Sequence, residues 1–509
     1  MLSKVLSFGL LGIEAYPVEI EVDVSAGLPA VTVVGMADTS VKESKERVKA
    51  AIKNSGFCWP DDRITINLAP SEIKKEGAAF DLPIALGVLA ASRQVDAERL
   101  KNYHILGELS LDGSLRPIRG ALPISMAVAA KQVKNLVIPY VNAREAIIIE
   151  DTNAWPLKTL KETVEFLHNP DLAQPFKMDL EELFRKNCRY DVDFAEVKGQ
   201  YLAKRALEVA VSGGHNILMI GPPGSGKTML AKRIPTILPE LTLPEALEIT
   251  KIHSVTGNMP FQKGLTATRP FRCPHHGISS SALIGGGNSS PQPGEISLAH
   301  QGVLFLDELP EFRRDCLEAL RQPLEDSYIR ISRATGSSVF PASFILTAAL
   351  NPCPCGYLTD PQKPCRCNPG KIADYMAKIS GPLLDRIDIH IELPPIRYKE
   401  LVSPADAEPS AVIKMRVEAA RAIQRERFRA EGIFCNARMT TRLIKKYCLL
   451  HEEAKELLKM AMTEMGLSAR AYDKILRISR TIADLDEAET ICAEHISEAV
   501  QYRSLDRRW

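Results

Sequence analysis

At the centre of the sequence stands Gly221-Pro222-Pro223-Gly224-Ser225-Gly226-Lys227-Thr228, which matches the phosphate-binding loop pattern G-x-x-x-x-G-K-[ST] at every defined position. A mainly apolar run, 216–220, precedes this loop and is typical of a buried strand, and the residues after the loop have the pattern of a helix. In such a strand–loop–helix unit, backbone N–H groups surround phosphate oxygens at the positive end of the helix. We therefore expect the whole loop to bind ATP, with Lys227 on the β- and γ-phosphates and Thr228 on Mg²⁺.

A second apolar run, 303–306, ends in two carboxylates, Asp307 and Glu308, as at the carboxyl end of a buried parallel strand. We expect Asp307 to hold Mg²⁺ through water, and Glu308 to orient and activate the water that attacks the γ-phosphate. An apolar run that ends in acidic residues is common by itself. Its combination with the phosphate loop predicts an ATP hydrolase.

The overall composition is ordinary for a globular protein and shows no bulk preference for nucleic acid. The chain has 509 residues, enough for about three domains, and is 45% hydrophobic and 25% charged. Its 64 Lys and Arg against 63 Asp and Glu give a net charge of +1, so a nucleic-acid site would have to be a local basic patch or channel. The apolar run near the N-terminus is short and broken by Glu14, and no run of about 18 apolar residues occurs. We therefore expect a cytoplasmic protein without a membrane span.

The hydrophobic patterns predict an α/β multidomain protein. Period-two alternation over 17–24 is typical of a half-buried strand in an N-terminal α/β domain, and five apolar-periodic segments after residue 410 are typical of helices. The expected boundaries are 1–170 for the N-terminal domain, 171–195 for a linker, 196–395 for a nucleotide-binding core with a parallel sheet, 396–410 for a second linker, and 411–509 for a C-terminal helical lid.

Between the phosphate loop and the acidic strand lies a long stretch, 250–301, that is rich in Gly, Ser and Pro. We expect this insert to be a structureless loop with a functional role. It contains Cys273, His275 and His276, which suit either a metal site or a contact with substrate or a neighbouring subunit.

A basic hairpin is expected after the acidic strand. Alternating residues at 328–333 and a returning strand at 339–349 predict it, with a turn at 335–336. Arg330 and Arg333 then lie near its tip. They form either a solvated basic surface or a pore loop that grips DNA phosphates.

The returning strand leads into Asn351, which is placed to hydrogen-bond the γ-phosphate or the attacking water. Close behind it follow four of the chain's 11 cysteines, and we expect these four to be metal ligands: Cys353, Cys355, Cys365 and Cys367. In a chain without an export signal, such a cluster favours a tetrahedral zinc site over disulfides, with free reduced thiols as the alternative.

Two arginines are candidates for contact with nucleotide. Arg386 lies among acidic residues at 385–388 and fits either a surface ion pair or an arginine finger that reaches the γ-phosphate of a neighbouring subunit. Arg470 opens the penultimate helix and either is solvated or contacts nucleotide from the lid. A finger that acts on a neighbour implies a ring-shaped homo-oligomer.

The N-terminal domain resembles the proteolytic domain of Lon-type proteases through two blocks, Lys75-Glu76-Gly77-Ala78-Ala79-Phe80-Asp81 and GSLRPIRG at 113–120. Where that family carries a nucleophilic Ser and a basic Lys, this sequence has Ala79 and Leu122. Since Ser–Lys chemistry needs both groups, the resemblance implies a degenerate fold that is kept for binding or assembly.

Taken together, the phosphate loop, the His275-His276 insert, the acidic strand, the cysteine pairs, and the segments 385–388 and 468–472 resemble the ComM/YifB family of magnesium chelatase-like AAA+ proteins. The resemblance covers nearly the whole chain. It implies an AAA+ fold with Asn351 as first sensor, Arg386 as finger and Arg470 as second sensor. It also implies ATP and Mg²⁺ as cofactors, and a hexameric helicase that acts on single-stranded or branched DNA and promotes branch migration during natural transformation.

A chelatase- or chaperone-type motor that remodels a protein partner is the alternative function. The N-terminal domain and the cysteine pairs are not expected in the chelatase I subunit, which favours the DNA motor. ATP hydrolysis stimulated by DNA would support the motor, and stimulation only by a partner protein would support the alternative.

Overall fold

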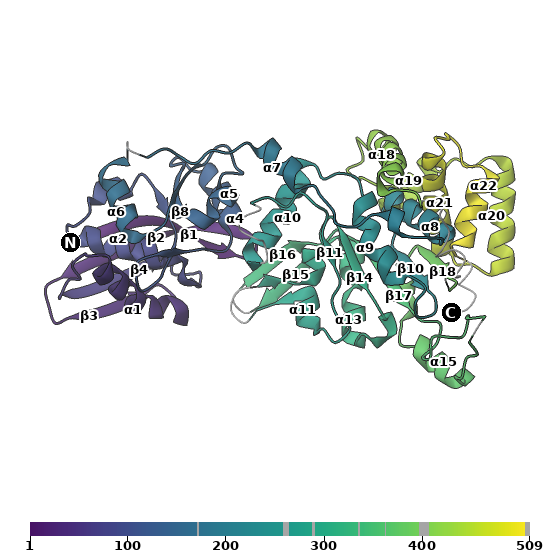
Figure 1. Cartoon of the computed structure of the whole chain (residues 1–509), viewed down its shortest axis with the longest axis horizontal. Helices are drawn as coiled ribbons and strands as arrows, with labels where there is room; N and C mark the ends of the chain where they lie inside the picture. The colour runs from purple at the N-terminus through teal and green to yellow at the C-terminus, as the bar shows by residue number, and fades with distance from the viewer. Residues whose placement is uncertain are drawn as a thin grey trace.

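The computed structural model describes residues 1–170, 173–257, 264–287, 291–333, 336–361, 363–395 and 407–503, and these form an elongated molecule (Figure 1). A seven-stranded sheet lies at one end, a five-stranded sheet lies in the middle, and a group of helices lies at the other end. The expected α/β multidomain class, with a parallel core sheet and a helical C-terminal region, is confirmed. Residue 335 of the turn expected at 335–336 and most of the second linker lie outside the described residues, whereas Gly336 begins the strand that closes the hairpin.

The N-terminal sheet is mixed and has the strand order β3-β4-β2-β1-β5-β8-β9. The β2 strand alternates buried and more exposed residues over its middle, as its sequence pattern predicted. It pairs antiparallel with β1 and with β4, whereas β5, β8 and β9 continue the sheet in parallel. The strands of this region are β1 Leu2–Leu11, β2 Glu14–Ser25, β3 Ala30–Val34, β4 Arg63–Ala69, β5 His104–Ile105, β6 Glu108–Leu109, β7 Leu115–Arg116, β8 Asn135–Pro139 and β9 Asn153–Leu157.

Helices cover this sheet. One of them, Asp81–Ala91, is buried along its whole length because it packs against β1 and β2. Another, Thr39–Asn54, begins after Asp38, whose carboxylate accepts the Val41 N–H at 2.8 Å. The helices are α1 Thr39–Asn54, α2 Asp81–Ala91, α3 Ala97–Leu100, α4 Ala121–Ala129, α5 Ala143–Ala146 and α6 Leu160–His168, and the first expected linker contains α7 Leu180–Asn187.

The core sheet is entirely parallel, in the order β11-β14-β17-β10-β18. Its strands and those of its two small hairpins are β10 Ile217–Ile220, β11 Phe271–Arg272, β12 Gly285–Gly286, β13 Gln292–Pro293, β14 Val303–Leu306, β15 Tyr328–Arg333, β16 Gly336–Pro341, β17 Ile345–Leu350 and β18 Ile389–Glu392. The helices around it are α8 Tyr201–Gly213, α9 Lys227–Ile237, α10 Leu243–Thr256, α11 Ser280–Ile284, α12 Glu295–Leu298, α13 Arg314–Ala319, α14 Arg321–Asp326, α15 Pro369–Met376 and α16 Gly381–Leu384.

The register of this sheet decides which side chains can meet. Ile220 of β10 pairs with Leu350 of β17, and Leu306 of β14 pairs with Ala348 of the same strand. The segments that follow these three strands therefore leave the sheet at one edge, the carboxyl edge. Residues that precede β18, among them Arg386, lie at the opposite amino edge, where the Arg386 carbonyl accepts a hydrogen bond from Asn216 Nδ2 at 3.0 Å.

Two sequence predictions for the core were wrong. The insert at 250–301 is not structureless, because its described part contains the end of α10, β11, α11, the β12–β13 hairpin and α12. The returning strand at 339–349 is two strands: β16 closes the hairpin, and β17 enters the parallel sheet after a break at 342–344. One continuous apolar pattern hid this change of partner.

The C-terminal helices match their expected positions closely. They are α18 Ser410–Arg427, α19 Thr441–Tyr447, α20 Glu452–Met465, α21 Ala469–Leu485 and α22 Ala493–Gln501. Among the residues that the structure describes, no helix is both long and apolar enough to cross a membrane.

The N-terminal region packs directly on the core. Ile13, in the turn between β1 and β2, is only 8% exposed and belongs to the same buried cluster as Ile331 and Phe340 of the β15–β16 hairpin. Glu14 pairs with Lys251 of α10 at 2.6 Å. The N-terminal region therefore contacts both α10 and the basic hairpin.

Candidate nucleotide-binding site

The phosphate loop joins β10 to α9 with the backbone that the pattern requires. Gly224 and Gly226 have φ angles of 78° and 89°, a left-handed conformation that strains other residues. The Lys227 ammonium is buried and donates to the carbonyls of Gly221 at 2.6 Å and Pro222 at 3.0 Å. Burial lowers the pKa of Lys227, and the charges of Asp307 and Glu308 act in the opposite direction. The negative charge of a bound phosphate would offset the cost of burying this ammonium among neutral carbonyl groups.

Two oxygen ligands for Mg²⁺ meet beside the loop. The Thr228 hydroxyl donates to Asp307 Oδ2 at 2.7 Å. A hydroxyl and a carboxylate in contact at the first turn of a helix suit a hard cation that bridges to phosphate oxygens. Thr228 and Asp307 therefore form a site that suits Mg²⁺.

Asn351 completes the same edge. It directly follows β17, and because Leu350 pairs with Ile220, it lies beside the first residue of the phosphate loop. Its Oδ1 lies 3.3 Å from the Lys227 ammonium. The structure thus brings together Lys227, Thr228, Asp307 and Asn351, as the sequence analysis expected. Their roles in catalysis remain predictions.

Glu308 has a contact that the sequence analysis did not anticipate. Its backbone is left-handed, with a φ of 52°, and its carboxylate Oε2 lies 3.3 Å from Nδ1 of His276. His276 comes from the segment after β11, the strand that pairs with β14. That pairing could not be inferred, because β11 has only two residues.

The four cysteines form the metal-binding geometry that their spacing predicted. In the described part of the chain, they are the one cluster of three or more potential ligands, and their four sulfurs lie within 4.8 Å of one another. Cys353 Sγ lies 3.4 Å from Cys355 Sγ and 3.6 Å from Cys365 Sγ. Tetrahedral zinc with bonds of about 2.3 Å separates its sulfurs by about 3.8 Å. The cluster therefore fits zinc, whereas Cys273, His275 and His276 do not form such a group.

The cysteine segment touches the phosphate loop. Gly356 has a φ of 83°, and a Cβ at this position would lie 2.6 Å from Cδ of Pro223. Only glycine allows this approach. A metal that fixes the cysteine segment would therefore also support the loop.

Arg386 and Arg470 lie away from this chain's own phosphate loop. At the amino edge of the sheet, Arg386 pairs with Glu325 and donates to the Pro382 carbonyl at 2.5 Å. Arg470 pairs with Asp385 at 3.2 Å. The structure thus places the two arginines in neighbouring ion pairs and does not bring either to the carboxyl edge.

Arg330 and Arg333 are both exposed on β15. Arg333 pairs with Gly336 at the end of the hairpin, whereas Arg330 pairs with Val339, three residues further from the turn. The two side chains are available to solvent beside the N-terminal region.

The two positions that correspond to the Ser and Lys of Lon-type proteases hold Ala79 and Leu122. Leu122 is buried and donates its backbone N–H to Glu145 at 2.9 Å, and the Ala79 carbonyl accepts from Gly107 N at 2.9 Å. Neither side chain is a nucleophile or a base.

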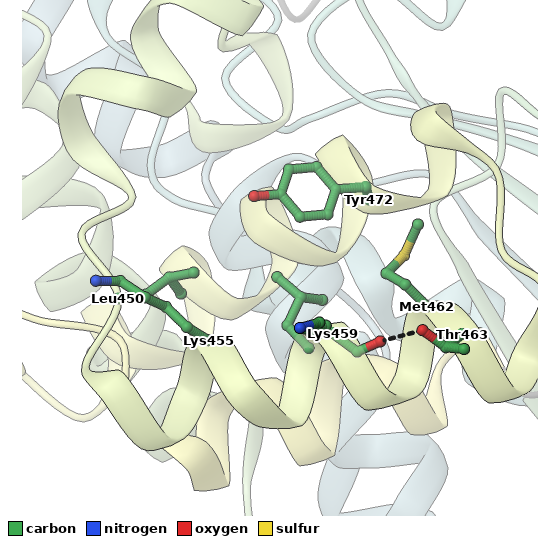
Figure 2. Close-up of a pocket in the computed structure, with 7 residues that line it drawn as sticks. Leu450, Lys455, Lys459, Met462, Thr463 and Tyr472 are labelled. Carbon is green, nitrogen blue, oxygen red and sulfur yellow. Dashed lines mark hydrogen bonds between the residues drawn. The ribbon is translucent and has the colours of Figure 1, made fainter.

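A pocket of about 340 Å³ lies among the C-terminal helices (Figure 2). Figure 2 shows Tyr472 of α21 facing α20, where Thr463 donates to the Lys459 carbonyl at 2.9 Å. The pocket is lined by Leu450, Lys455, Leu458, Lys459, Met462, Thr463 and Tyr472. None of these residues belongs to the phosphate loop or to the segments that follow β14 and β17, so this pocket is separate from the phosphate site.

The parallel sheet, the phosphate loop and the acidic strand define an AAA+ protein. Three family models of the ChlI subunit of magnesium chelatase match the chain. One model of the subunit matches residues 193–401, another matches 20–142, and the model of the subunit's C-terminal part matches 407–503. The chain is 44% identical over 509 residues to competence protein ComM of Haemophilus influenzae, covering 99% of this chain and 98% of that protein. It is 43% identical over 499 residues to YifB of Salmonella typhimurium, covering 98% and 96%.

The chain belongs to the ComM/YifB family of magnesium chelatase-like AAA+ proteins, as its motifs predicted, and this membership implies ATPase activity. Lon protease 2 of Bacillus subtilis is 28% identical over 182 residues, or 32% of each chain, which confirms the likeness to a Lon-type protein.

Proposed function

We propose that this protein is an ATP-driven DNA helicase that works as a hexameric ring and promotes branch migration of recombination intermediates in natural transformation. The similarity over nearly full length to a competence protein supports this function. The single structural observation that carries it is the exposed Arg330 and Arg333 on a hairpin of the ATPase core, because DNA phosphates need such local positive charge in a chain of net charge +1.

The division of the chain into an N-terminal domain at 1–170, a core at 196–395 and a helical lid at 411–509 is part of this proposal. The core carries hydrolysis: the loop from Gly221 to Thr228 binds ATP, and Asp307 helps to hold Mg²⁺. Glu308 activates water, and Asn351 senses the γ-phosphate. Zinc on Cys353, Cys355, Cys365 and Cys367 has a structural role.

The placement of the arginines supports the proposed ring. Arg386 lies at the amino edge of the sheet, and its own phosphate loop lies at the carboxyl edge. To reach a γ-phosphate, it must act on the loop of another subunit. Arg470 lies beside it through Asp385, so we assign the second sensor to the same neighbouring site and not to the chain's own lid.

Hydrolysis of ATP with and without single-stranded and forked DNA tests this function. We expect DNA to stimulate turnover, and Arg330→Ala to remove the stimulation. The matched control is Arg313→Ala, an exposed arginine that pairs with Asp315. If only a protein partner stimulates turnover, the remodelling motor replaces the helicase.

A further inference from the structure

The cysteine segment and the helix that follows it present two cations without an ionic partner among the described residues. Arg366 lies between the last two cysteines of the cluster, Lys371 lies in the first turn of α15, and both residues are exposed. The first turn of α15 has no acidic residue, so Lys371 also meets the positive end of the helix dipole. These two side chains, which we call the knuckle surface, therefore suit an anionic partner from elsewhere.

The cysteine segment is anchored at the phosphate site. Gly356 approaches Pro223 of the phosphate loop so closely that a Cβ on it would lie 2.6 Å from Cδ of Pro223. The neighbouring Cys355 has its Sγ 3.6 Å from that of Cys365, the residue before Arg366. A group of another subunit that reaches the γ-phosphate therefore arrives beside the cysteine segment.

Two carboxylates at the amino edge of the sheet match these two cations. The side chain of Glu325 is 60% exposed and pairs with Arg386, and that of Asp385 is 43% exposed and pairs with Arg470. In the proposed ring, both arginines turn from these pairs to the ATP of a neighbouring subunit. Exposed ion pairs add little stability, so the arginines leave them at little cost. The two carboxylates then lack a cation at the same subunit boundary at which the knuckle surface lacks an anion.

We propose that the knuckle surface binds the Glu325 and Asp385 carboxylates of a second copy of this chain when the arginines of that copy turn to the bound ATP. This inference rests on the proposed function, because it needs the ring in which Arg386 acts on a neighbour. DNA phosphates are the other anions that two exposed cations attract. The anchoring of the segment at the phosphate site and the two matching carboxylates favour the second copy.

Charge reversal on the knuckle surface tests this contact. Arg366→Glu with Lys371→Glu should raise the protein concentration at the midpoint of assembly by about tenfold, because each subunit loses two exposed ion pairs. Light scattering over a concentration series, with a slowly hydrolysed ATP analogue, measures the midpoint. The affinity for ATP below the midpoint should stay unchanged, since the phosphate loop is untouched. The control is Lys42→Glu with Lys45→Glu, which makes the same change of charge at two exposed lysines of α1 and should assemble as the wild type does.

Charge reversal on the carboxylates tests the other side of the contact. Glu325→Lys with Asp385→Lys should also weaken assembly. When these two substitutions are joined to Arg366→Glu and Lys371→Glu in one chain, the midpoint should return toward that of the wild type, because each reversed cation again meets an opposite charge. Arg366→Gln with Lys371→Gln removes charge without reversing it and should shift the midpoint in the same direction by less.

The inference is overturned if Arg366→Glu with Lys371→Glu assembles as the wild type does, or if the combined variant assembles no better than this one. It is also overturned if the reversal lowers the affinity for single-stranded DNA and leaves assembly unchanged, since the surface then binds DNA. If wild-type rings form but their turnover ignores DNA, the proposed helicase fails, whereas the assembly midpoints still decide the contact. If the wild-type protein forms no ring, the ring and this contact both fail.

Discussion

The two edges of the core sheet are built differently. At the carboxyl edge, Lys227, Thr228, Asp307 and Asn351 come from three strand ends and contact one another within one chain. At the amino edge, Arg386 lies away from the phosphate loop of its own chain and is paired with Glu325. The comparison teaches that the carboxyl edge gathers its expected groups within one chain, whereas Arg386, in the role that we propose for it, needs the phosphate loop of a second copy.

The largest effect should come from breaking the carboxyl edge. Lys227→Ala removes the buried ammonium that the loop holds for phosphate, so we expect ATP binding and turnover to disappear. Nucleotide binding by calorimetry measures this. Lys232→Ala, an exposed lysine on the same helix, is the control and should bind as the wild type does. Normal ATP turnover by Lys227→Ala would contradict the assignment of the phosphate loop as the ATP-binding site.

Breaking the amino edge should lower the rate of ATP hydrolysis nearly as much as Lys227→Ala does, but it should leave ATP binding intact. Arg386→Ala should lower kcat by about 10³-fold, as fingers that act on a neighbour do. The affinity for ATP should not change, because Arg386 lies away from its own loop. Arg429→Ala, an 82% exposed arginine, is the control. A loss of ATP affinity in Arg386→Ala would mean that the arginine serves its own chain.

Glu308→Gln should separate the two functions of the carboxyl edge. Without the base we expect turnover to fall by about 10²-fold while ATP stays bound, and the bound nucleotide should stabilise the ring. Light scattering with ATP measures the assembly. Glu311 lies in the turn that begins after Glu308, and it pairs with Lys378. The control variant Glu311→Gln should therefore hydrolyse ATP normally. Wild-type hydrolysis by Glu308→Gln would contradict its assigned role.

The smallest effect concerns the cysteine segment. Cys353→Ser with Cys355→Ser should lose bound zinc, and because Gly356 packs on Pro223 we expect the affinity for ATP to weaken several-fold. Elemental analysis and nucleotide binding measure the two effects. Cys58→Ser, an exposed cysteine far from the cluster in sequence, should change neither. If elemental analysis finds no zinc in the wild-type protein, the assignment of the four cysteines as zinc ligands is wrong.

The sequence predicted those parts of the fold that rest on local patterns. The strand–loop–helix around Lys227 and the helices after residue 410 have clear periodicity, and the structure places them close to the expected bounds. The β1 strand was missed because its apolar run was considered only as an export signal. The β16–β17 break was missed because both strands are apolar, and only their partners differ.

For the site, sequence reasoning found the residues that follow core strands but not the contacts made across the insert. The His276–Glu308 contact depends on the pairing of β11 with β14, and β11 is too short to show a period. The Arg470–Asp385 pair joins residues 85 positions apart. No local pattern reports such a contact, so the position of Arg470 at the amino edge could only come from the structure.

The most direct measurement is ATP turnover by a mixture of Lys227→Ala and Arg386→Ala. Each variant alone should be inactive, one through its carboxyl edge and the other through its amino edge. When the two share a ring, an intact loop of Arg386→Ala faces an intact arginine of Lys227→Ala, and we expect turnover to return. A mixture that assembles into rings and stays inactive would contradict a site completed between two subunits.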